Sequence, residues 1–285
     1  MKVAFQGEIG AFSEEAAGRL YPGCSVVPLP AMEDVFMAVE AQTVSRGIVP
    51  IENSLFGSVH INYDLLRAHQ VRIEGEVKLR IRHFLMAKPG ARVEDIQRVL
   101  SHPQALGQCQ TFLKEKLGWS EVVPTYDTAG AAKLIAAEDN LTSAAIGPAR
   151  AAQEYGLEVL ATDLQSHALN YTRFLALAPE NAEKYISAET SLKTSIVFAL
   201  KQTVPGALFK SLSVFFLRDL DLYKVESRPL IGHPGDYLFY LDVEGDTADP
   251  VLQRALEHLG EITTDLRILG SYPRGQTWDG DHVSQ

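Results

Sequence analysis

The sequence predicts an α/β protein with two lobes and a smaller C-terminal domain. Strand-like and helix-like runs alternate over residues 2–51 and again over residues 98–161, which is typical of open, mostly parallel sheets. Residues 71–88 alternate like half-buried strands that join the lobes, and residues 174–178 are expected to return to the first lobe. From residue 194 the order changes to β-α-β-β-α-β, and a length of 285 residues agrees with about two domains.

Composition excludes several classes of partner. The formal net charge of −10 disfavours attraction to nucleic acid and to anionic lipid, so we expect neither partner. No apolar run approaches the roughly 20 residues that span a membrane. The N-terminus is typical of a first strand rather than a signal peptide, which predicts a cytoplasmic location. Cys24 and Cys109 are too few for a disulfide framework or a four-cysteine zinc site.

The elements are expected in a definite order. In the first lobe, Ser13 is a candidate N-cap, with Glu14 and Glu15 in the first turn, where the helix dipole favours negative charge. First-lobe strands are expected at residues 2–6, 25–29 and 47–51, and helices at 12–20 and 32–44. Second-lobe strands are expected at residues 98–101, 121–124, 143–146 and 157–161, and helices at 105–117, 129–137 and 150–155.

The C-terminal part is expected to form a ferredoxin-like domain after a linker at residues 179–192. Its last ten residues, 276–285, lack a periodic apolar face and are expected to be a frayed tail. The C-terminal strands are expected at residues 194–200, 222–227, 237–244 and 262–269, and the helices at 207–217 and 248–259.

Polar loops follow three first- and second-lobe strands, at residues 6–13, 52–60 and 101–108, where ligands bind in open α/β sheets. Metal, nucleotide and nucleophile-elbow motifs are missing from the sequence, so we expect no metal and no cofactor. Each loop alone is equally explained as a cap or turn. Together, hydroxyls, amides, backbone N–H groups and one guanidinium suit a small organic ligand that carries carboxylates.

Four segments resemble the signature motifs of the prephenate dehydratase family, in order and spacing. They are residues 6–13 (QGEIGAFS), 49–54 (VPIENS, with Gly57), 101–105 (SHPQA, with Gln108) and 170–174 (NYTRF). The resemblance covers roughly residues 1–275.

The resemblance implies a carbon–oxygen lyase that converts prephenate to phenylpyruvate, carbon dioxide and water without a cofactor. It also implies a catalytic domain at 1–185 with a periplasmic-binding-protein-like fold of type II. Lobe one would span about 1–75 plus 162–182, and lobe two about 76–161. With no chorismate mutase segment before Met1, the monofunctional form is expected.

The family's essential threonine corresponds to Thr172, whose hydroxyl would donate a hydrogen bond to the leaving oxygen. Arg173, also assigned to catalysis, would pair either with a substrate carboxylate or with a cleft-wall residue such as Glu52. The residues expected to bind the substrate or to organise the cleft are Asn53, Ser54, Ser101, Gln104, Gln108, Phe174, Gln6 and Ser13.

Residues 206–209 (GALF) and 226–229 (ESRP) resemble the phenylalanine-sensing motifs of ACT domains, which implies an ACT domain at 193–272 and feedback by L-phenylalanine. Without the resemblance, residues 206–209 could equally be an ordinary helix start. ACT domains usually pair, so a dimer or tetramer is expected. Asp221 stands where the family usually has asparagine, and it cannot donate to a carboxylate. The expected effector site comprises Gly206, Ala207, Leu208, Phe209, Asp221, Glu226, Ser227 and Arg228.

Two alternatives remain open. The substrate could be arogenate, which differs from prephenate only in carrying an amino group in place of the keto group. The chain could also be a two-lobed amino-acid sensor without turnover.

Overall fold

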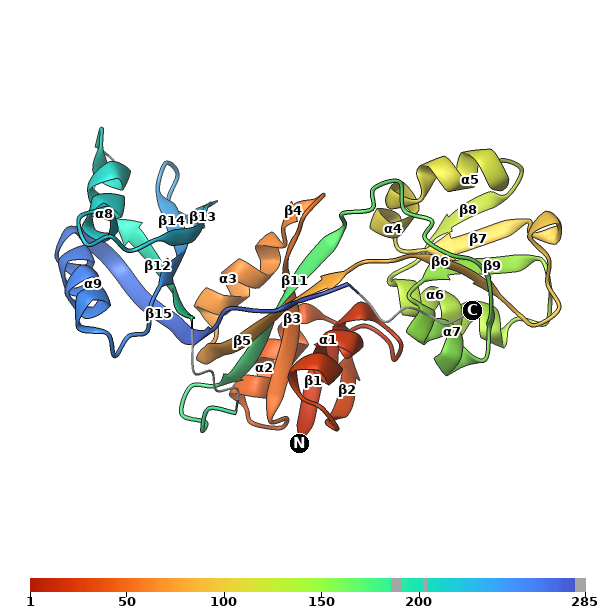
Figure 1. Cartoon of the computed structure of the whole chain (residues 1–285), viewed down its shortest axis with the longest axis horizontal. Helices are drawn as coiled ribbons and strands as arrows, with labels where there is room; N and C mark the ends of the chain where they lie inside the picture. The colour runs from red at the N-terminus through yellow and green to blue at the C-terminus, as the bar shows by residue number, and fades with distance from the viewer. Residues whose placement is uncertain (186–190, 202–203, 280–285) are drawn as a thin grey trace.

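The computed structural model describes residues 1–185, 191–201 and 204–279, which form three sheets. Figure 1 shows the sheets in a row, with the first in the middle, the second beside α4–α7 and the third beside α8 and α9. We call the units built on them the first lobe, the second lobe and the C-terminal domain. The linker residues 186–190 and the tail residues 280–285 lie outside the described part of the chain.

The first lobe is a seven-stranded sheet in the order β16-β5-β11-β3-β1-β2, with β4 paired to β3. β1 is parallel to β2 and β3, whereas β11 is antiparallel to both β3 and β5. The predicted return of the chain to the first lobe is therefore confirmed. The elements are β1 (Lys2–Gln6), α1 (Phe12–Leu20), β2 (Ser25–Leu29), α2 (Met32–Glu40), β3 (Arg46–Asn53), β4 (Gly57–Ser58), α3 (His60–Ala68), β5 (Val71–Arg80), β11 (Tyr171–Pro179) and β16 (Thr277–Trp278).

The second lobe is a five-stranded sheet in the order β10-β6-β9-β7-β8. Its elements are β6 (Phe84–Ala87), a 3₁₀ turn (Val93–Asp95), β7 (Arg98–Ser101), α4 (Pro103–Gln108), α5 (Gln110–Lys116), β8 (Glu121–Pro124), α6 (Thr128–Ala137), β9 (Ser143–Gly147), α7 (Ala149–Tyr155) and β10 (Glu158–Ala161).

The C-terminal domain has the predicted β-α-β-β-α-β order and a four-stranded antiparallel sheet, β13-β14-β12-β15. The predicted fold class is thus confirmed. Its elements are β12 (Leu192–Leu200), α8 (Ala207–Phe216), β13 (Leu222–Pro229), β14 (Tyr237–Glu244), α9 (Pro250–Ile262) and β15 (Thr263–Pro273).

Strand β11 has both faces buried, and its side chains alternate between two hydrophobic cores. Phe174 packs in the core that includes α1 and residues of the second lobe. Leu175 and Leu177 pack in the core that includes α2, α3 and the third sheet. Burying side chains of this size stabilises the fold by about 1.5–3 kcal/mol each. The alternation therefore fixes which face of the sheet every β11 residue occupies.

Several local expectations are corrected. Ala11, rather than Ser13, is the N-cap of α1. The helix expected at 105–117 breaks at Cys109 into α4 and α5, and the helix expected at 32–44 ends at Glu40, just before Gln42 with a φ of 56°.

The chain after residue 276 also differs from the expected tail. Thr277 and Trp278 form β16, which pairs in parallel with β5, and Arg19 lies over the Trp278 ring at 4.5 Å. Helix α3 was not anticipated from the sequence. No helix among residues 1–185, 191–201 and 204–279 has the length and apolar character needed to cross a membrane.

Candidate active site

A cavity of about 370 Å³ lies between the first and second lobes, at the carboxyl ends of β1, β3 and β7. Strand β11 contributes Thr172 and Phe174, which lie on the same face because they are two residues apart. The predicted loops therefore meet, although they are far apart in the sequence. Of the predicted substrate or catalytic residues, the cavity is lined by Gln6, Ser13, Asn53, Gln104, Gln108, Thr172 and Phe174.

The starts of several helices contribute to the same lining. Ala11, Phe12 and Ser13 begin α1, Val59 precedes α3, and Asp127 and Thr128 begin α6. The first N–H groups of a helix have no intrahelical partner, and the helix dipole adds partial positive charge there. No lysine or arginine of the described chain lines this cavity. Because the Asp127 carboxylate already caps α6, the starts of α1 and α3 supply the local positive potential that a carboxylate needs in an acidic protein.

Asn53 fixes the direction of the hydrogen bond to Thr172. The Asn53 Oδ1 atom accepts from the backbone N–H groups of Leu55 at 2.9 Å and Phe56 at 3.1 Å. The Asn53 amide nitrogen then donates to Thr172 Oγ1 at 3.0 Å and to Asn170 Oδ1 at 2.9 Å. Because the Thr172 oxygen accepts this bond, its own proton remains available for a ligand in the cavity.

The amide network continues into the second lobe. Asn170, which is fully buried, donates to Gln108 Oε1 at 2.9 Å, and His83 Nε2 donates to the same oxygen at 2.5 Å. Burial lowers the pKa of His83 to about 4, although the bond to Gln108 opposes this, so the ring is neutral at pH 7. His83 Nδ1 has no hydrogen-bond partner within the described chain. It therefore offers a buried acceptor beside the cavity.

Sequence reasoning missed His83 and Asn170. Asn170 lies in the NYTRF segment, so that motif was the available signal. His83 lies within the strand-like run of residues 71–88 and has no distinguishing neighbours. His102 caps α4: its Nδ1 accepts from Gln104 N at 3.3 Å. Burial lowers the pKa of His102 as well.

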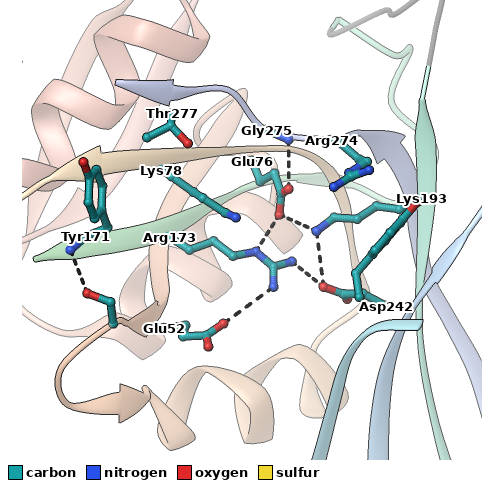
Figure 2. Close-up of a pocket in the computed structure, with 12 residues that line it drawn as sticks. Glu52, Glu76, Lys78, Tyr171, Arg173, Lys193, Asp242, Arg274, Gly275 and Thr277 are labelled. Carbon is teal, nitrogen blue, oxygen red and sulfur yellow. Dashed lines mark hydrogen bonds and ion pairs between the residues drawn. The ribbon is translucent and has the colours of Figure 1, made fainter. Parts of the chain in front are cut away.

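Arg173 points away from this cavity, into a second cavity of about 480 Å³ beside the C-terminal domain. Figure 2 shows its guanidinium among three carboxylates. Its closest nitrogen atoms lie 2.5 Å from Glu76, 2.7 Å from Asp242 and 4.0 Å from Glu52. Burial alone would raise the pKa of Glu76 and Asp242, but the charges of Arg173 and Lys193 outweigh it and lower both. The geometry therefore favours the ion-pair interpretation of Arg173 over contact with a substrate carboxylate.

Two predicted serines also lie outside the cavity lining. Ser54 Oγ donates to Leu169 O at 3.1 Å and accepts from Tyr171 N at 2.9 Å, at the edge of the second cavity. Ser101 is fully buried and donates to Ile146 O at 2.6 Å. Both hydroxyls hold neighbouring chain segments together, and the structure does not bring them to the cavity.

The predicted effector residues are divided between two surfaces. Gly206, with a φ of 81°, precedes α8, and Phe209 on that helix is 75% exposed. Glu226 accepts from Ser58 at 2.6 Å, and Arg228 pairs with Asp64 at 2.7 Å, so both face the first lobe. The remaining predicted members are the partly buried Leu208 and Ala207, the exposed Ser227, and Asp221, which accepts from the N–H of Leu222.

Among the described residues, no group of three or more His, Cys, Asp or Glu side chains could hold a metal ion. Cys109 is buried in an apolar core, and burial raises its thiol pKa to about 12. The cavity thus offers neutral hydrogen-bond groups, helix starts and one carboxylate, Asp127, for its chemistry.

The fold and this cavity define a two-lobed α/β enzyme with an appended C-terminal domain. The family model of prephenate dehydratase matches residues 3–182, so the chain belongs to the prephenate dehydratase family, whose members are lyases.

Curated relatives agree with this assignment. The chain is 51% identical to "Arogenate dehydratase/prephenate dehydratase 2, chloroplastic" of Arabidopsis thaliana, over 96% of this chain and 73% of that protein. It is 49% identical to "Arogenate dehydratase 2" of Petunia hybrida, over 96% and 72% of the two proteins. The predicted cytoplasmic location is wrong by this comparison, because the similar Arabidopsis proteins are described as chloroplastic.

Solved structures show the same fold over 96% of the chain. A prephenate dehydratase from Arthrobacter aurescens in complex with L-Phe has a TM-score of 0.87 and 33% identity, covering 96% of this chain and 90% of that one. A structure described as GqqA, a quorum quenching acylase, has a TM-score of 0.86 and 31% identity, covering 96% and 98% of the two chains.

Proposed function

We propose that the protein is a prephenate dehydratase that forms phenylpyruvate in phenylalanine biosynthesis. The observation that carries this proposal is the direction of the Asn53–Thr172 hydrogen bond, which leaves the threonine proton free inside the cavity between the lobes. A sensor would need binding groups only. A hydroxyl held with its proton free is what a leaving oxygen requires as negative charge develops on it.

The reaction balances without a cofactor. The ring carboxylate leaves as carbon dioxide, and the electrons of its C–C bond enter the ring. The C–O bond on the opposite side of the ring breaks, and the departing oxygen takes one proton to become water. Aromatisation drives the electron shift, so the protein has to bind, orient and polarise. Thr172 donates to the departing oxygen, and the starts of α1 and α3 bind the carboxylates.

Turnover of prephenate tests this proposal directly. The purified protein is mixed with prephenate, and phenylpyruvate is followed by the ultraviolet absorbance of its enolate in alkali. We expect product to appear with the enzyme and to be nearly lost with Thr172→Ala. Binding of prephenate without any product would support the sensor alternative instead.

Arogenate is a second candidate substrate, and the charge of the cavity favours it. Asp127 is the one carboxylate among the described lining residues, and its oxygens accept from Gly130 N at 2.7 Å and Glu8 N at 2.9 Å. Both substrates carry two carboxylates, but arogenate also carries an ammonium group. An ammonium is attracted to the Asp127 carboxylate, whereas the keto group of prephenate gains nothing from it.

The ratio of kcat/KM for the two substrates tests this choice. Asp127→Asn keeps the oxygen that caps α6 and removes the charge, so we expect the ratio to move toward prephenate. Glu8→Gln is the matched control, because Glu8 lies outside the lining and pairs with Lys133. An unchanged ratio of the two kcat/KM values in Asp127→Asn would show that Asp127 does not influence the choice between prephenate and arogenate.

We further propose an ACT domain at residues 193–272 following a catalytic domain at 1–185, with L-phenylalanine as effector and pairing into a dimer or tetramer. The L-Phe complex of the Arthrobacter neighbour and the β-α-β-β-α-β order support this. The proposed site is the predicted set of eight residues from Gly206 to Arg228. We expect L-phenylalanine to inhibit turnover and Gly206→Val or Ser227→Ala to weaken the response. Inhibition unchanged in both folded variants would contradict this site.

A further inference from the structure

Two neighbouring residue pairs on β3 and β11 face opposite sides of the first sheet. In the antiparallel register, Asn53 lies opposite Thr172, and Glu52 lies opposite Arg173. Asn53 and Thr172 line the cavity between the lobes, whereas Glu52 and Arg173 line the cavity beside the C-terminal domain. At consecutive positions, each strand therefore carries one residue that lines the cavity between the lobes and one that lines the cavity beside the C-terminal domain. Their Cα atoms are about 3.8 Å apart.

Glu52 and Arg173 both bind the C-terminal domain. Arg173 pairs with Asp242 of β14 at 2.7 Å, and Glu52 pairs with Lys224 of β13 at 3.1 Å. Arg173 is 8% exposed and Asp242 is 7% exposed, so water screens their interaction little. Figure 2 shows that Lys193, at the start of β12, also bridges Glu76 and Asp242. The two strands that carry the cavity residues are thus attached to two strands of the C-terminal domain.

We propose that Glu52 and Arg173 are positioning residues through which the C-terminal domain sets the geometry of Asn53 and Thr172. This inference rests on the proposed dehydratase function. A strand moves as a unit because its peptide planes are stiff, so a displacement of Arg173 is passed to the hydroxyl of Thr172. Since a small misplacement of a catalytic group is costly, the C-terminal domain can change turnover without touching the substrate.

A second ion pair between the first lobe and the C-terminal domain provides a matched control. Arg228 of β13 pairs with Asp64 of α3 at 2.7 Å, the same distance as the Arg173–Asp242 pair. The residues of α3 itself, His60–Ala68, are not part of the cavity lining. Loss of this pair loosens the contact between the units but leaves β3 and β11 attached.

The experiment compares Asp242→Asn and Lys224→Met with Asp64→Asn in the full chain. We expect the first two to lower kcat about tenfold, the effect of misplacing one hydrogen bond, with KM within about twofold. Asp64→Asn is expected to keep the wild-type kcat. Hydrogen exchange of peptides covering residues 50–56 and 170–174 should quicken in the first two variants and not in the control.

The outcomes are distinct. Wild-type kcat and exchange in folded Lys224→Met and Asp242→Asn would overturn the inference, and so would an equal fall of kcat in Asp64→Asn. If Asp242→Asn is unstable because Asp242 is buried, Lys224→Met alone tests the inference. That variant is expected to fold because Glu52 and Lys224 are partly exposed. If the wild type turns over neither prephenate nor arogenate, the proposed function fails, while the exchange measurement still tests the attachment of β3 and β11.

Discussion

Gly10 of the first lobe lies directly against Ala151 of the second lobe. A Cβ atom on Gly10 would be 2.8 Å from the Cα atom of Ala151, and Gly10 has a φ of 94°. Helix α7, which carries Ala151, therefore meets the β1–α1 loop at a point where no side chain fits. The same loop continues into Phe12 and Ser13 of the cavity lining, so this contact sets how closely the two lobes approach.

Gly10→Ala should separate the lobes. Because the backbone of Ala151 cannot yield as a flexible side chain does, we expect KM to rise and the protein to lose about 1–3 kcal/mol of stability. Steady-state kinetics and urea unfolding measure the two effects. Gly18→Ala is the control, since it sits in α1 with nothing within 4 Å, and it should be neutral or stabilising. Unchanged KM and stability in Gly10→Ala would contradict the close approach.

Thr172→Ala should lower kcat by about 10²–10³ with little change in KM, because the lost hydrogen bond forms mainly as the leaving oxygen gains charge. Thr172→Ser keeps the hydroxyl and should retain most of the activity. Steady-state rates with prephenate and arogenate check both variants. If Thr172→Ala raised KM and left kcat unchanged, the hydroxyl would serve binding rather than the chemical step.

Asn53→Asp should be nearly as damaging as Thr172→Ala. The new carboxylate cannot donate to Thr172, so the threonine proton would turn toward it and away from the substrate. The double variant supplies the control: once Thr172 is alanine, Asn53→Asp should cost little more, which is non-additive behaviour. Additive losses in kcat would show that Asn53 acts independently of Thr172.

His83 should make stability depend on pH. Its pKa falls from 6.5 in the unfolded chain to about 4 in the folded protein, so acid favours the unfolded state, which binds the proton first. The stabilisation is complete above pH 6.5 and is lost between pH 6.5 and about 4. At 1.36 kcal/mol for each pH unit this is about 3 kcal/mol. Urea unfolding of the wild type and His83→Gln over this range measures the contribution, and equal slopes for the two proteins would contradict it.

The order of elements could be read from the sequence because hydrophobic periodicity is local. The alternation over residues 2–51 and 98–161 gave the two lobes, and the β-α-β-β-α-β order gave the C-terminal domain. Boundaries were less accurate where backbone geometry interrupts a helical pattern, as at Cys109 between α4 and α5. β16 was missed because a two-residue strand has too few positions to show a period.

Several residues of the site could also be predicted from the sequence. The polar loops after strands identified Gln6, Asn53 and Gln104, since the carboxyl ends of strands share an edge of the sheet. Thr172 and Arg173, in contrast, were both assigned to catalysis. They lie in β11, where consecutive side chains must point to opposite faces.

The sequence by itself therefore determined the fold class, the family and the chemical character of the cavity, because these depend on residue types and their spacing along the chain. Only the tertiary structure decided that Thr172 faces the substrate cavity and Arg173 the C-terminal domain, and that His83 and Asn170 join the polar network. Those roles depend on strand pairing between residues far apart in the sequence, such as Asn53 and Thr172, which are 119 positions apart, and no local pattern encodes that register.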